Sequence, residues 1–438
     1  MPKSHSKWIC QQCAYESTGW LGKCPSCGSW NTLVETVVAV GTTNSRLRKD
    51  VSARQAKPQN LSQIKISKNS RVSTRIPELD RVLGGGLVTG QVVLLAGEPG
   101  IGKSTILLQL SDILAKVLYV AGEESAQQIG IRAQRLGIRN KKIEVLEETN
   151  VDEVVVAIEQ SSNLTMVVVD SIQTMYTSDL TGLSGSVGQV RECAFRLLKV
   201  AKAKGIPLFI VGHVTKEGTV AGPAVLAHIV DTVLWFEGDK TLTLRMLRAY
   251  KNRFGPTDEV GIFTMEDKGL ISVTSAEKIF LSKDTKAVSG SCVTSILEGT
   301  RPILVEIQSL VVPTKLAFPK RTSQGFDAKR LELMLAILQK RCGLPMGEFD
   351  VFVNVVGGVT IKDPGADLAV CLSIASSYFD KALPSKLIAV GEVDLLGEIR
   401  QAQSQERRIK EARRVGFSPT VSNKETKYLN QTISRLLR

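Results

Sequence analysis

The sequence predicts an α/β protein, and three observations support that prediction. Short apolar runs alternate with helical patterns from about Val72 to Ser275, which is typical of a parallel sheet covered by helices. A separate alternation of strands and helices continues to the end of the chain. Four cysteines within the first 30 residues indicate a small metal-binding module. The expected segments are a metal module at 1–40, a linker at 41–71, and α/β units at 72–275 and 286–438.

The composition limits the class of protein. A chain of 438 residues is too long for one ordinary domain. The hydrophobic fraction is 43% with no uninterrupted apolar run of 18 residues, which predicts a soluble protein without a transmembrane helix. The N-terminus lacks the apolar stretch of a secretion signal, so we expect a cytoplasmic protein without a membrane partner. A net charge of +13 favours a polyanionic partner, although solubility alone would also account for it.

The four N-terminal cysteines form the pattern CxxC-x10-CxxC. Two such pairs place four thiolates at the corners of a tetrahedron, the geometry that Zn²⁺ prefers, and a fully occupied thiolate set makes the ion structural. A redox dithiol pair is the alternative. Trp8, Trp20 and Trp30 lie around these pairs; stacking on nucleic-acid bases is conceivable, but a module this small needs core aromatics, and we expect them there. The predicted zinc ligands are Cys10, Cys13, Cys24 and Cys27.

The segment after the cysteines is predicted to be a basic linker. From Ser45 to Arg75 the chain carries nine Lys or Arg residues against the single acid Asp50, and large apolar residues are few. Its charge would suit a phosphate backbone. A solvated connector is at least as good an interpretation.

The central motif lies between Gln91 and Thr105, where QVVLLAGEPGIGKST contains the P-loop pattern GxxxxGK[ST]. An apolar run precedes the pattern and a helix-compatible run follows it. Backbone N–H groups of such a loop converge at a helix N-terminus and form an anion site for phosphates. Lys103 would meet the β- and γ-phosphates, and Ser104 would bind Mg²⁺. The predicted nucleotide-binding residues are Gly97, Glu98, Pro99, Gly100, Ile101, Gly102, Lys103, Ser104 and Thr105.

Two further strand ends supply carboxylates. The apolar run Val117 to Ala121 leads to Glu123 and Glu124, and an acid there would orient or deprotonate the attacking water. We prefer Glu123, with Glu124 next and a helix-capping role as the alternative. The run Leu164 to Asp170 ends in an aspartate, the Walker B form, which predicts that Asp170 holds Mg²⁺ through water.

Other polar residues follow the later strands. His213 ends the apolar run Ile206 to Gly212 and is either a sensor of the γ-phosphate or a polar residue satisfied within its own turn. Two loops rich in small residues are expected at Thr177 to Gly188 and at Thr215 to Gly222. Both would lie at the carboxyl edge of the sheet, where a ligand binds.

Lys251 and Arg253 belong to the run KNRFG, which follows a predicted β-hairpin. Residues two apart on an extended segment project to the same side, so the two cations suit one anion. Since the P-loop already contains Lys103, we expect them to act on the nucleotide of a neighbouring subunit, as an arginine finger does.

The order of these motifs resembles that of the bacterial RadA (Sms) family of DNA repair proteins over essentially the whole chain. The motifs are the zinc ribbon, GEPGIGKST, VAGEES, VVVDS, GHVTKEG and KNRFG, the last being the family's distinguishing motif. The resemblance implies a RecA-like ATPase core at 72–275, ATP with Mg²⁺ as ligands and a homo-hexameric ring. It also implies binding of single-stranded and branched DNA, and branch migration in homologous recombination beside proteins such as RecA. The two loops would face the DNA.

The segment from 286 to the end resembles the proteolytic domain of Lon proteases, through Gly357 to Ala375 and Gly391 to Arg400. That chemistry needs a serine nucleophile activated by a lysine. The aligned positions hold Ala366 and Glu406, so we expect no protease activity and interpret the domain as a ring scaffold. From Arg400 to the end, the chain carries ten Lys or Arg residues against three acids. This charge favours phosphate contacts or a solvated basic helix.

The sequence therefore predicts a DNA-stimulated ATPase, acting as a translocase or helicase on recombination intermediates. A RecA-like regulatory module that hydrolyses ATP slowly is the alternative, and turnover indifferent to DNA would favour it. An ATP-dependent protease is a third hypothesis, against which the missing dyad argues. The predicted catalytic residues are Lys103, Glu123, Asp170, Lys251 and Arg253.

Overall fold

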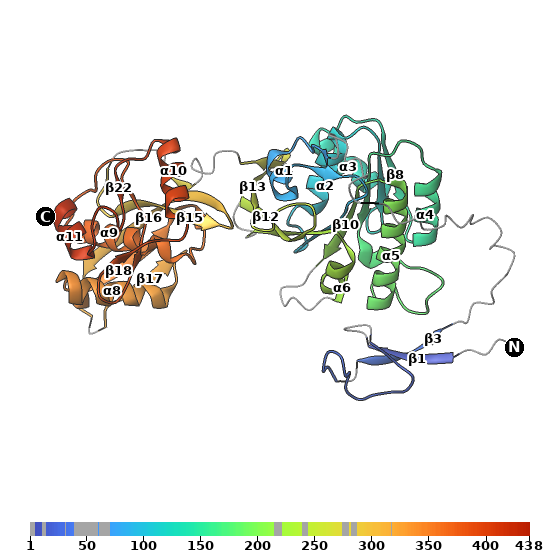
Figure 1. Cartoon of the computed structure of the whole chain (residues 1–438), viewed down its shortest axis with the longest axis horizontal. Coiled ribbons are helices and arrows are strands. Elements are labelled where there is room, and N and C mark those ends of the chain that lie inside the picture. The colour runs from blue at the N-terminus through green and yellow to red at the C-terminus, as the bar shows by residue number, and fades with distance from the viewer. Residues whose placement is uncertain are drawn as a thin grey trace. The chain divides into compact units, whose positions relative to one another are not determined.

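The chain folds into two compact units, Met1–Ser272 and Val273–Arg438, in a computed structural model. Figure 1 shows a small set of strands near the N-terminus, a large sheet with helices on both faces, and a second sheet with its own helices in the C-terminal unit. The structure describes residues 5–10, 15–30, 32–38, 60, 71–213, 221–238, 244–273, 280–281, 287–316 and 318–438.

The N-terminal ribbon consists of a three-stranded antiparallel sheet and the chain at 15–30. The strand order is β2-β1-β3, and Cys10, at the end of β1, pairs with Leu33 at the start of β3. The strands are β1 (His5–Cys10), β2 (Glu16–Ser17) and β3 (Leu33–Val38).

The large sheet of the first unit has nine strands within the described residues, in the order β14-β13-β12-β11-β6-β10-β9-β7-β8. The six strands from β11 to β8 are parallel, which confirms the predicted α/β fold, and β12 to β14 extend the sheet antiparallel. In chain order the strands are β6 (Val92–Gly97), β7 (Val117–Ala121), β8 (Ile143–Glu147), β9 (Met166–Asp170), β10 (Leu208–His213), β11 (Thr232–Glu237), β12 (Leu244–Asn252), β13 (Val260–Glu266) and β14 (Gly269–Ser272).

Helices cover both faces of this sheet, and local signals fix several of their ends. Ser125 and Gln128 form a capping box at the start of α3, while Gly205 ends α5 in the left-handed conformation. The helices and short elements are β4 (Arg71–Val72), α1 (Pro77–Leu83), β5 (Leu87–Val88), α2 (Lys103–Ile113), α3 (Ala126–Leu136), α4 (Val151–Gln160), η2 (Ile172–Thr174), α5 (Val187–Lys204) and α6 (Ala221–Ile229).

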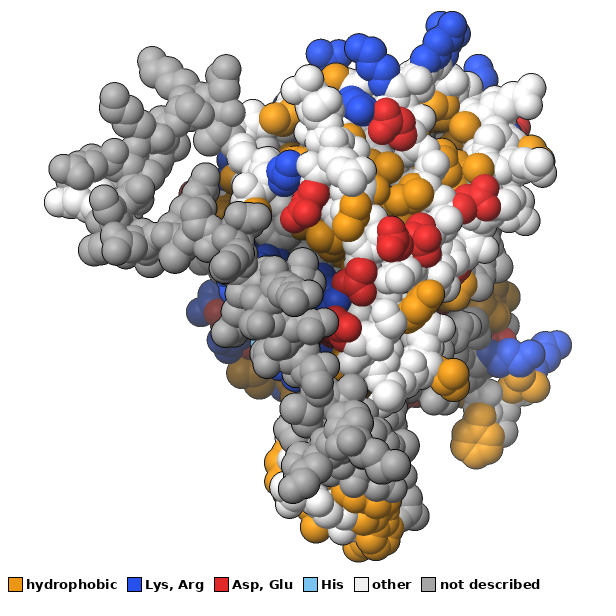
Figure 2. All heavy atoms as spheres, turned by 90° about the vertical axis from the view of Figure 1, so that its right-hand side faces the viewer, with side chains coloured by type: hydrophobic (Ala, Val, Ile, Leu, Met, Phe, Trp, Pro, Cys, Tyr) orange, Lys and Arg blue, Asp and Glu red, His pale blue; other side chains and the backbone are white. Residues whose placement is uncertain are grey.

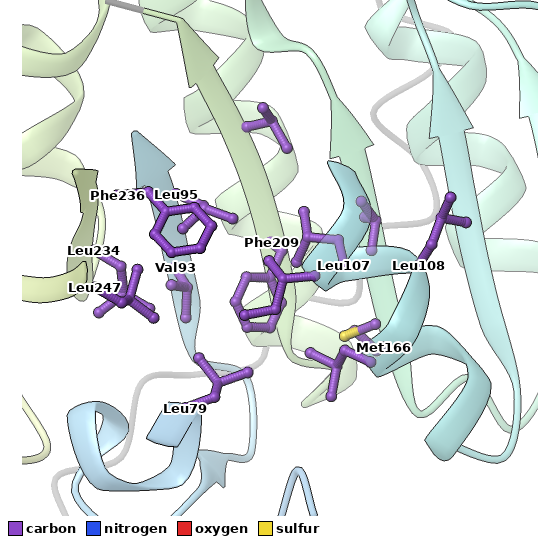
Figure 3. Close-up of a cluster of buried hydrophobic side chains, with 14 of the residues drawn as sticks. Leu79, Val93, Leu95, Leu107, Leu108, Met166, Phe209, Leu234, Phe236 and Leu247 are labelled. Carbon is purple, nitrogen blue, oxygen red and sulfur yellow. The ribbon is translucent and has the colours of Figure 1, made fainter. Parts of the chain in front are cut away.

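The core explains why the central strands are apolar throughout. Alternate side chains of β6 enter two different clusters: Val93 and Leu95 pack with α1, α2 and α3, while Val92 and Leu94 pack with α4, α5 and α6. Figure 3 shows the first cluster, in which Leu107 and other residues of α2 lie against the sheet. Burial on both faces removes the polar alternation of a half-exposed strand, so these strands appear as continuous apolar runs.

The C-terminal unit contains a mixed sheet in the order β17-β18-β16-β15-β19-β22, with α9 packed against β15 and β16. The β15 and β16 strands form an antiparallel hairpin. The strands are β15 (Ser291–Glu298), β16 (Arg301–Pro313), β17 (Arg321–Gln324), β18 (Phe349–Val355), β19 (Ile388–Ala389), β20 (Glu392–Val393), β21 (Ile399–Arg400) and β22 (Thr420–Val421). The helices are α8 (Ala328–Cys342), η3 (Met346–Glu348), η4 (Val356–Gly358), η5 (Pro364–Ala366), α9 (Asp367–Tyr378), α10 (Gln405–Val415) and α11 (Leu429–Leu437).

Across the described ranges, no helix combines the length and the apolar character needed to cross a bilayer.

Candidate functional site

The P-loop connects β6 to α2, and at two of its glycines, Gly97 and Gly102, an added Cβ would lie closer than 3 Å to a neighbouring atom. Gly97 has a φ of 153°, and a Cβ there would lie 2.6 Å from the carbonyl oxygen of Phe236. A Cβ on Gly102 would lie 2.8 Å from the side chain of Met265. Helix α2 then starts at Lys103 without a side-chain cap. The first-turn N–H groups of such a helix attract an anion, and Ser104 and Thr105 lie in that turn.

Lys103 is buried at the centre of this loop. Its Nζ donates hydrogen bonds to the carbonyls of Gly97 at 2.8 Å and Glu98 at 2.9 Å, and the residue is 3% exposed. Burial lowers the pKa of Lys103 to about 8, although the carboxylates of Asp170 and Glu123 oppose that shift. An anion that approaches the buried lysine would therefore stabilise its charged form and raise its pKa again.

Asp170 ends β9 beside β7, and a tyrosine fixes its carboxylate. The Tyr119 hydroxyl donates a hydrogen bond of 2.6 Å to Asp170 Oδ2. Burial and the charge of Asp170 raise the pKa of Tyr119 well above its usual value, so the hydroxyl keeps its proton and remains a donor. Sequence reasoning missed Tyr119. The available signal was a lone hydroxyl inside the buried strand VLYVA, since a buried polar group needs a partner.

The two neighbouring acids after β7 have different partners. Glu123 Oε1 accepts a hydrogen bond from the hydroxyl of Ser171, another residue that sequence reasoning missed, although it directly follows Asp170. Glu124 instead forms an ion pair with Arg132 on α3. Of the two acids, Glu123 is the one whose charge opposes the lowering of the pKa of Lys103.

His213 ends β10 and completes this group. Its Nε2 lies 3.4 Å from Glu123 Oε1, and among the described residues neither ring nitrogen has a hydrogen-bond partner, although both are buried. Burial and the charge of Lys103 lower the pKa of His213, so the ring is neutral at pH 7. A neutral, unpartnered imidazole at the edge of the sheet offers both a donor and an acceptor to a ligand.

The KNRFG run begins with the last two residues of β12, and both of its cations have partners within the chain. Lys251 Nζ donates to the carbonyls of Ala227 and Val230, each at 2.7 Å, and so caps the end of α6. Arg253 Nη1 lies 3.6 Å from the buried Asp231 Oδ1, and about half of the arginine side chain is exposed. Burial and the charge of Arg253 lower the pKa of Lys251. Within one chain, the two cations thus face different acceptors.

This run lies at the opposite edge of the sheet from the P-loop. Thr232 pairs with Asn252 of β12 and with Val93 of β6, whereas the P-loop begins at Gly97. Those four residues of β6 correspond to roughly 13 Å along the strand. In this arrangement Lys251 and Arg253 cannot contact a phosphate bound at the P-loop of their own chain.

The first loop rich in small residues, 177–188, is held by two side chains of α5. Gln189 Nε2 donates to the carbonyls of Thr177, Leu180 and Gly182. Arg196 pairs with Asp179 at 2.8 Å. The second expected loop, 215–222, lies outside the described residues up to residue 220.

Three of the four predicted zinc ligands lie together in the ribbon. The Sγ atoms of Cys10, Cys24 and Cys27 are within 4.8 Å of one another, and those of Cys10 and Cys27 are 3.7 Å apart. Thiolates about 2.3 Å from one zinc ion would be about 3.8 Å apart, so the sulfurs fit a tetrahedral site. Cys13 lies outside the described residues.

The ribbon tryptophans differ from expectation. Trp8 packs against the small cluster of Cys10, Cys24 and Leu33. Trp20 and Trp30 are 57% and 69% exposed, so the expectation that all three form the core is wrong. The cluster forms around the cysteines themselves, which reduces the need for large core aromatics.

In the C-terminal unit, the two positions aligned with a Ser-Lys dyad differ in burial. Ala366 is fully buried, whereas the Glu406 side chain is 82% exposed and pairs with Lys424 at 3.2 Å. The buried cation near Ala366 is Arg408, which pairs with Asp363 at 2.6 Å. Its Nη1 would lie 2.8 Å from a Cβ on the adjacent glycine at 365. The surroundings of Ala366 are therefore filled by a salt bridge.

Two family models match parts of this chain. Residues 55–219 match the AAA domain model, which supports ATP binding and hydrolysis, and residues 8–35 match the rubredoxin metal binding domain model, which supports a zinc ribbon. A solved KaiC-like protein from Pyrococcus horikoshii OT3 aligns over 46% of this chain and 98% of that chain, with 21% identity and a TM-score of 0.40.

Curated relatives span nearly the whole chain. The DNA repair protein RadA of Bacillus subtilis (strain 168) is 50% identical over 422 residues, which cover 95% of this chain and 92% of that protein. RadA of Aquifex aeolicus (strain VF5) is 46% identical over 420 residues, covering 95% and 93%. RadA of Pseudomonas aeruginosa PAO1 is 46% identical over 424 residues, covering 96% and 93%. Identity at this level over both full lengths shows that the chain belongs to the RadA family of DNA repair proteins.

Proposed function

We propose that the protein is a DNA-stimulated ATPase that binds single-stranded and branched DNA and promotes branch migration of recombination intermediates. The observation that carries the proposal is the convergence of Lys103, Asp170, Glu123 and His213 at one edge of the sheet, beside an uncapped helix. A phosphate-binding cation, a carboxylate for Mg²⁺ and a second carboxylate to orient the attacking water are recurring parts of a site for phosphoryl transfer to water.

ATP would bind along residues 97–105, and Lys103 would exchange its two carbonyl acceptors for phosphate oxygens. Bound Mg²⁺ would neutralise phosphate charge, and the Ser104 hydroxyl and the Asp170 carboxylate are oxygen donors of the kind that it prefers. The hydrogen bond from Tyr119 would keep that carboxylate oriented.

Glu123 would take the proton of the attacking water as general base. Its hydrogen bond from Ser171 fixes the carboxylate, and the neutral His213 beside it would contact the γ-phosphate. Glu124 is less suited to the role because Arg132 already holds it.

Lys251 and Arg253 would complete the nucleotide site of a neighbouring subunit in a hexameric ring. Their place at the far edge of the sheet supports action between subunits, because they cannot reach their own P-loop. Arg253 is the better placed to reach out, since about half of its side chain is exposed.

The remaining parts would serve this motor. The proposed division is a zinc ribbon at 1–40, a basic linker at 41–71, the RecA-like ATPase domain at 72–275 and a Lon-protease-like scaffold at 286–438. The scaffold would not cleave peptides, since a buried alanine and an exposed glutamate occupy the dyad positions 366 and 406.

The test is steady-state ATP hydrolysis with and without single-stranded DNA, for the wild type and Lys251→Ala. We expect stimulation by DNA that the variant loses. Lys116→Ala is the matched control, since it removes a lysine whose partner is the half-exposed Glu144, 3.0 Å away. Turnover indifferent to DNA would favour the regulatory module instead.

Action between subunits has its own test. Lys103→Ala and Lys251→Ala variants are each expected to lack DNA-stimulated hydrolysis, but a mixture should regain it, because some interfaces then pair an intact P-loop with an intact KNRFG run. A mixture as inactive as its components would contradict action between subunits.

A further inference from the structure

The N-terminal ribbon presents an aromatic surface that its fold does not use. Trp30 and Trp20 are 69% and 57% exposed, and Tyr15 and Leu21 are also exposed. Figure 2 shows hydrophobic side chains gathered on the described part of the ribbon, at the lower end of the view. Exposed large apolar groups are costly unless they serve an interaction, especially in a module this small.

The two indoles both lie next to Gly22. Gly22 stands between them: a Cβ at that position would lie 3.4 Å from the ring of Trp20 and 3.8 Å from the ring of Trp30. The Lys23 and Trp30 backbones pair across the turn, and the Lys23 ammonium lies 5.6 Å from the centre of the Trp30 ring. The surface thus combines two exposed rings with a cation in one short segment.

We infer that this surface is a stacking platform for the bases of single-stranded nucleic acid. Exposed aromatic rings beside a cation meet both requirements of such a ligand, because bases stack on the rings while the ammonium attracts the phosphates. The charge of the whole chain, +13, and the nine Lys or Arg residues from Ser45 to Arg75 favour a polyanion over an apolar protein partner.

The inference rests on the proposed function, since it assigns part of the DNA contact to the ribbon. It differs in kind from phosphate contacts at the sheet, because stacking requires bases. Two adjacent rings would hold two or more bases without regard to their sequence.

The test measures fluorescence anisotropy of the full-length protein with two labelled oligonucleotides of equal length, one of thymidine and one abasic. The paired change Trp20→Ala with Trp30→Ala should weaken binding to the thymidine strand about tenfold or more, since stacking contributes about 1–3 kcal/mol per base. Binding to the abasic strand should not change. The paired change Trp20→Phe with Trp30→Phe retains the rings and should stay close to the wild type.

Zinc content, measured in every variant, shows that the ribbon is folded. Equal weakening on both strands, or none on either, in a zinc-loaded variant would overturn the platform while leaving DNA binding intact; the second result would assign the surface to a protein partner. A wild type that binds neither strand would overturn the proposed function itself, and the platform with it.

Discussion

The P-loop edge of the first unit and the surroundings of Ala366 in the second unit are built from similar parts with opposite results. In each, a turn leads into a buried helix at the end of a sheet. At the P-loop, burial lowers the pKa of Lys103 although the carboxylates of Asp170 and Glu123 oppose that shift, and neither ring nitrogen of His213 has a hydrogen-bond partner among the described residues. Around Ala366, Arg408 and Asp363 satisfy one another and fill the space.

The difference teaches that reactivity depends on incomplete pairing. A buried cation with a matched carboxylate and two carbonyl acceptors, as Arg408 has, gains nothing from a ligand. Lys103, whose hydrogen bonds within the described part of the chain go to two carbonyls, gains charge stabilisation when a phosphate arrives.

The largest effect is expected from changing the carboxylates that follow β7. Glu123→Gln should lower single-turnover ATP hydrolysis by about 10²–10⁴-fold, because a general base contributes that much, while nucleotide affinity stays nearly constant. Glu124→Gln is the matched control and should cost less than about tenfold, since its carboxylate serves Arg132. A larger loss of hydrolysis in Glu124→Gln than in Glu123→Gln would assign the general base to Glu124 instead.

The second test concerns the salt bridge between Arg408 and Asp363 near Ala366. Arg408→Met should destabilise the C-terminal unit by about 3–5 kcal/mol, because the Asp363 carboxylate, which is 15% exposed, would keep its backbone N–H donors but lose its counter-charge. Arg414→Met is a control on the same helix: its pair with Glu411 is largely exposed and should contribute below about 1 kcal/mol. Amide hydrogen exchange in β15 and α10, read by mass spectrometry, measures both. Similar protection in the two variants would show that Arg408 is not needed there.

The third test uses pH. A bound phosphate favours the charged form of Lys103, so binding raises its pKa, and affinity is retained below the free-state value of about 8 and lost above it. Nucleotide affinity should therefore fall roughly tenfold between pH 7.5 and pH 9. Titration with a fluorescent nucleotide measures this, and calorimetry in two buffers should detect proton uptake above pH 8. Lys103→Arg should flatten the dependence; a wild-type profile that is flat to pH 9 would contradict the lowered pKa.

The smallest expected effect is that of reinstalling a dyad. Ala366→Ser together with Glu406→Lys should give no cleavage of labelled casein above background, because a side chain at 406 points to solvent and nothing there would neutralise a lysine. ATP-dependent release of peptides by the double variant would show that the site lacks only its two reactive groups.

Most of the elements that the sequence predicted correctly are marked by patterns of residues contiguous in the chain. The strands β6, β7 and β9 and the start of α2 could be predicted because apolar runs and the P-loop pattern are local. The contact between Tyr119 and Asp170 could not, since it joins positions 51 apart and depends on the register of β7 beside β9. The same holds for Lys251, whose acceptors lie on another element, and for Trp20 and Trp30, whose exposure follows from a core formed by cysteines.

The cap that Lys251 places on α6 has a mechanical consequence. Two hydrogen bonds of 2.7 Å join the end of β12 to the final turn of the helix, so α6 cannot slide or rotate without pulling Lys251 along or releasing it. Release would leave the two carbonyls and the ammonium without these hydrogen bonds, so each group would need another partner. The helix and the KNRFG run are therefore coupled: movement of either one changes how far the lysine is available to another molecule.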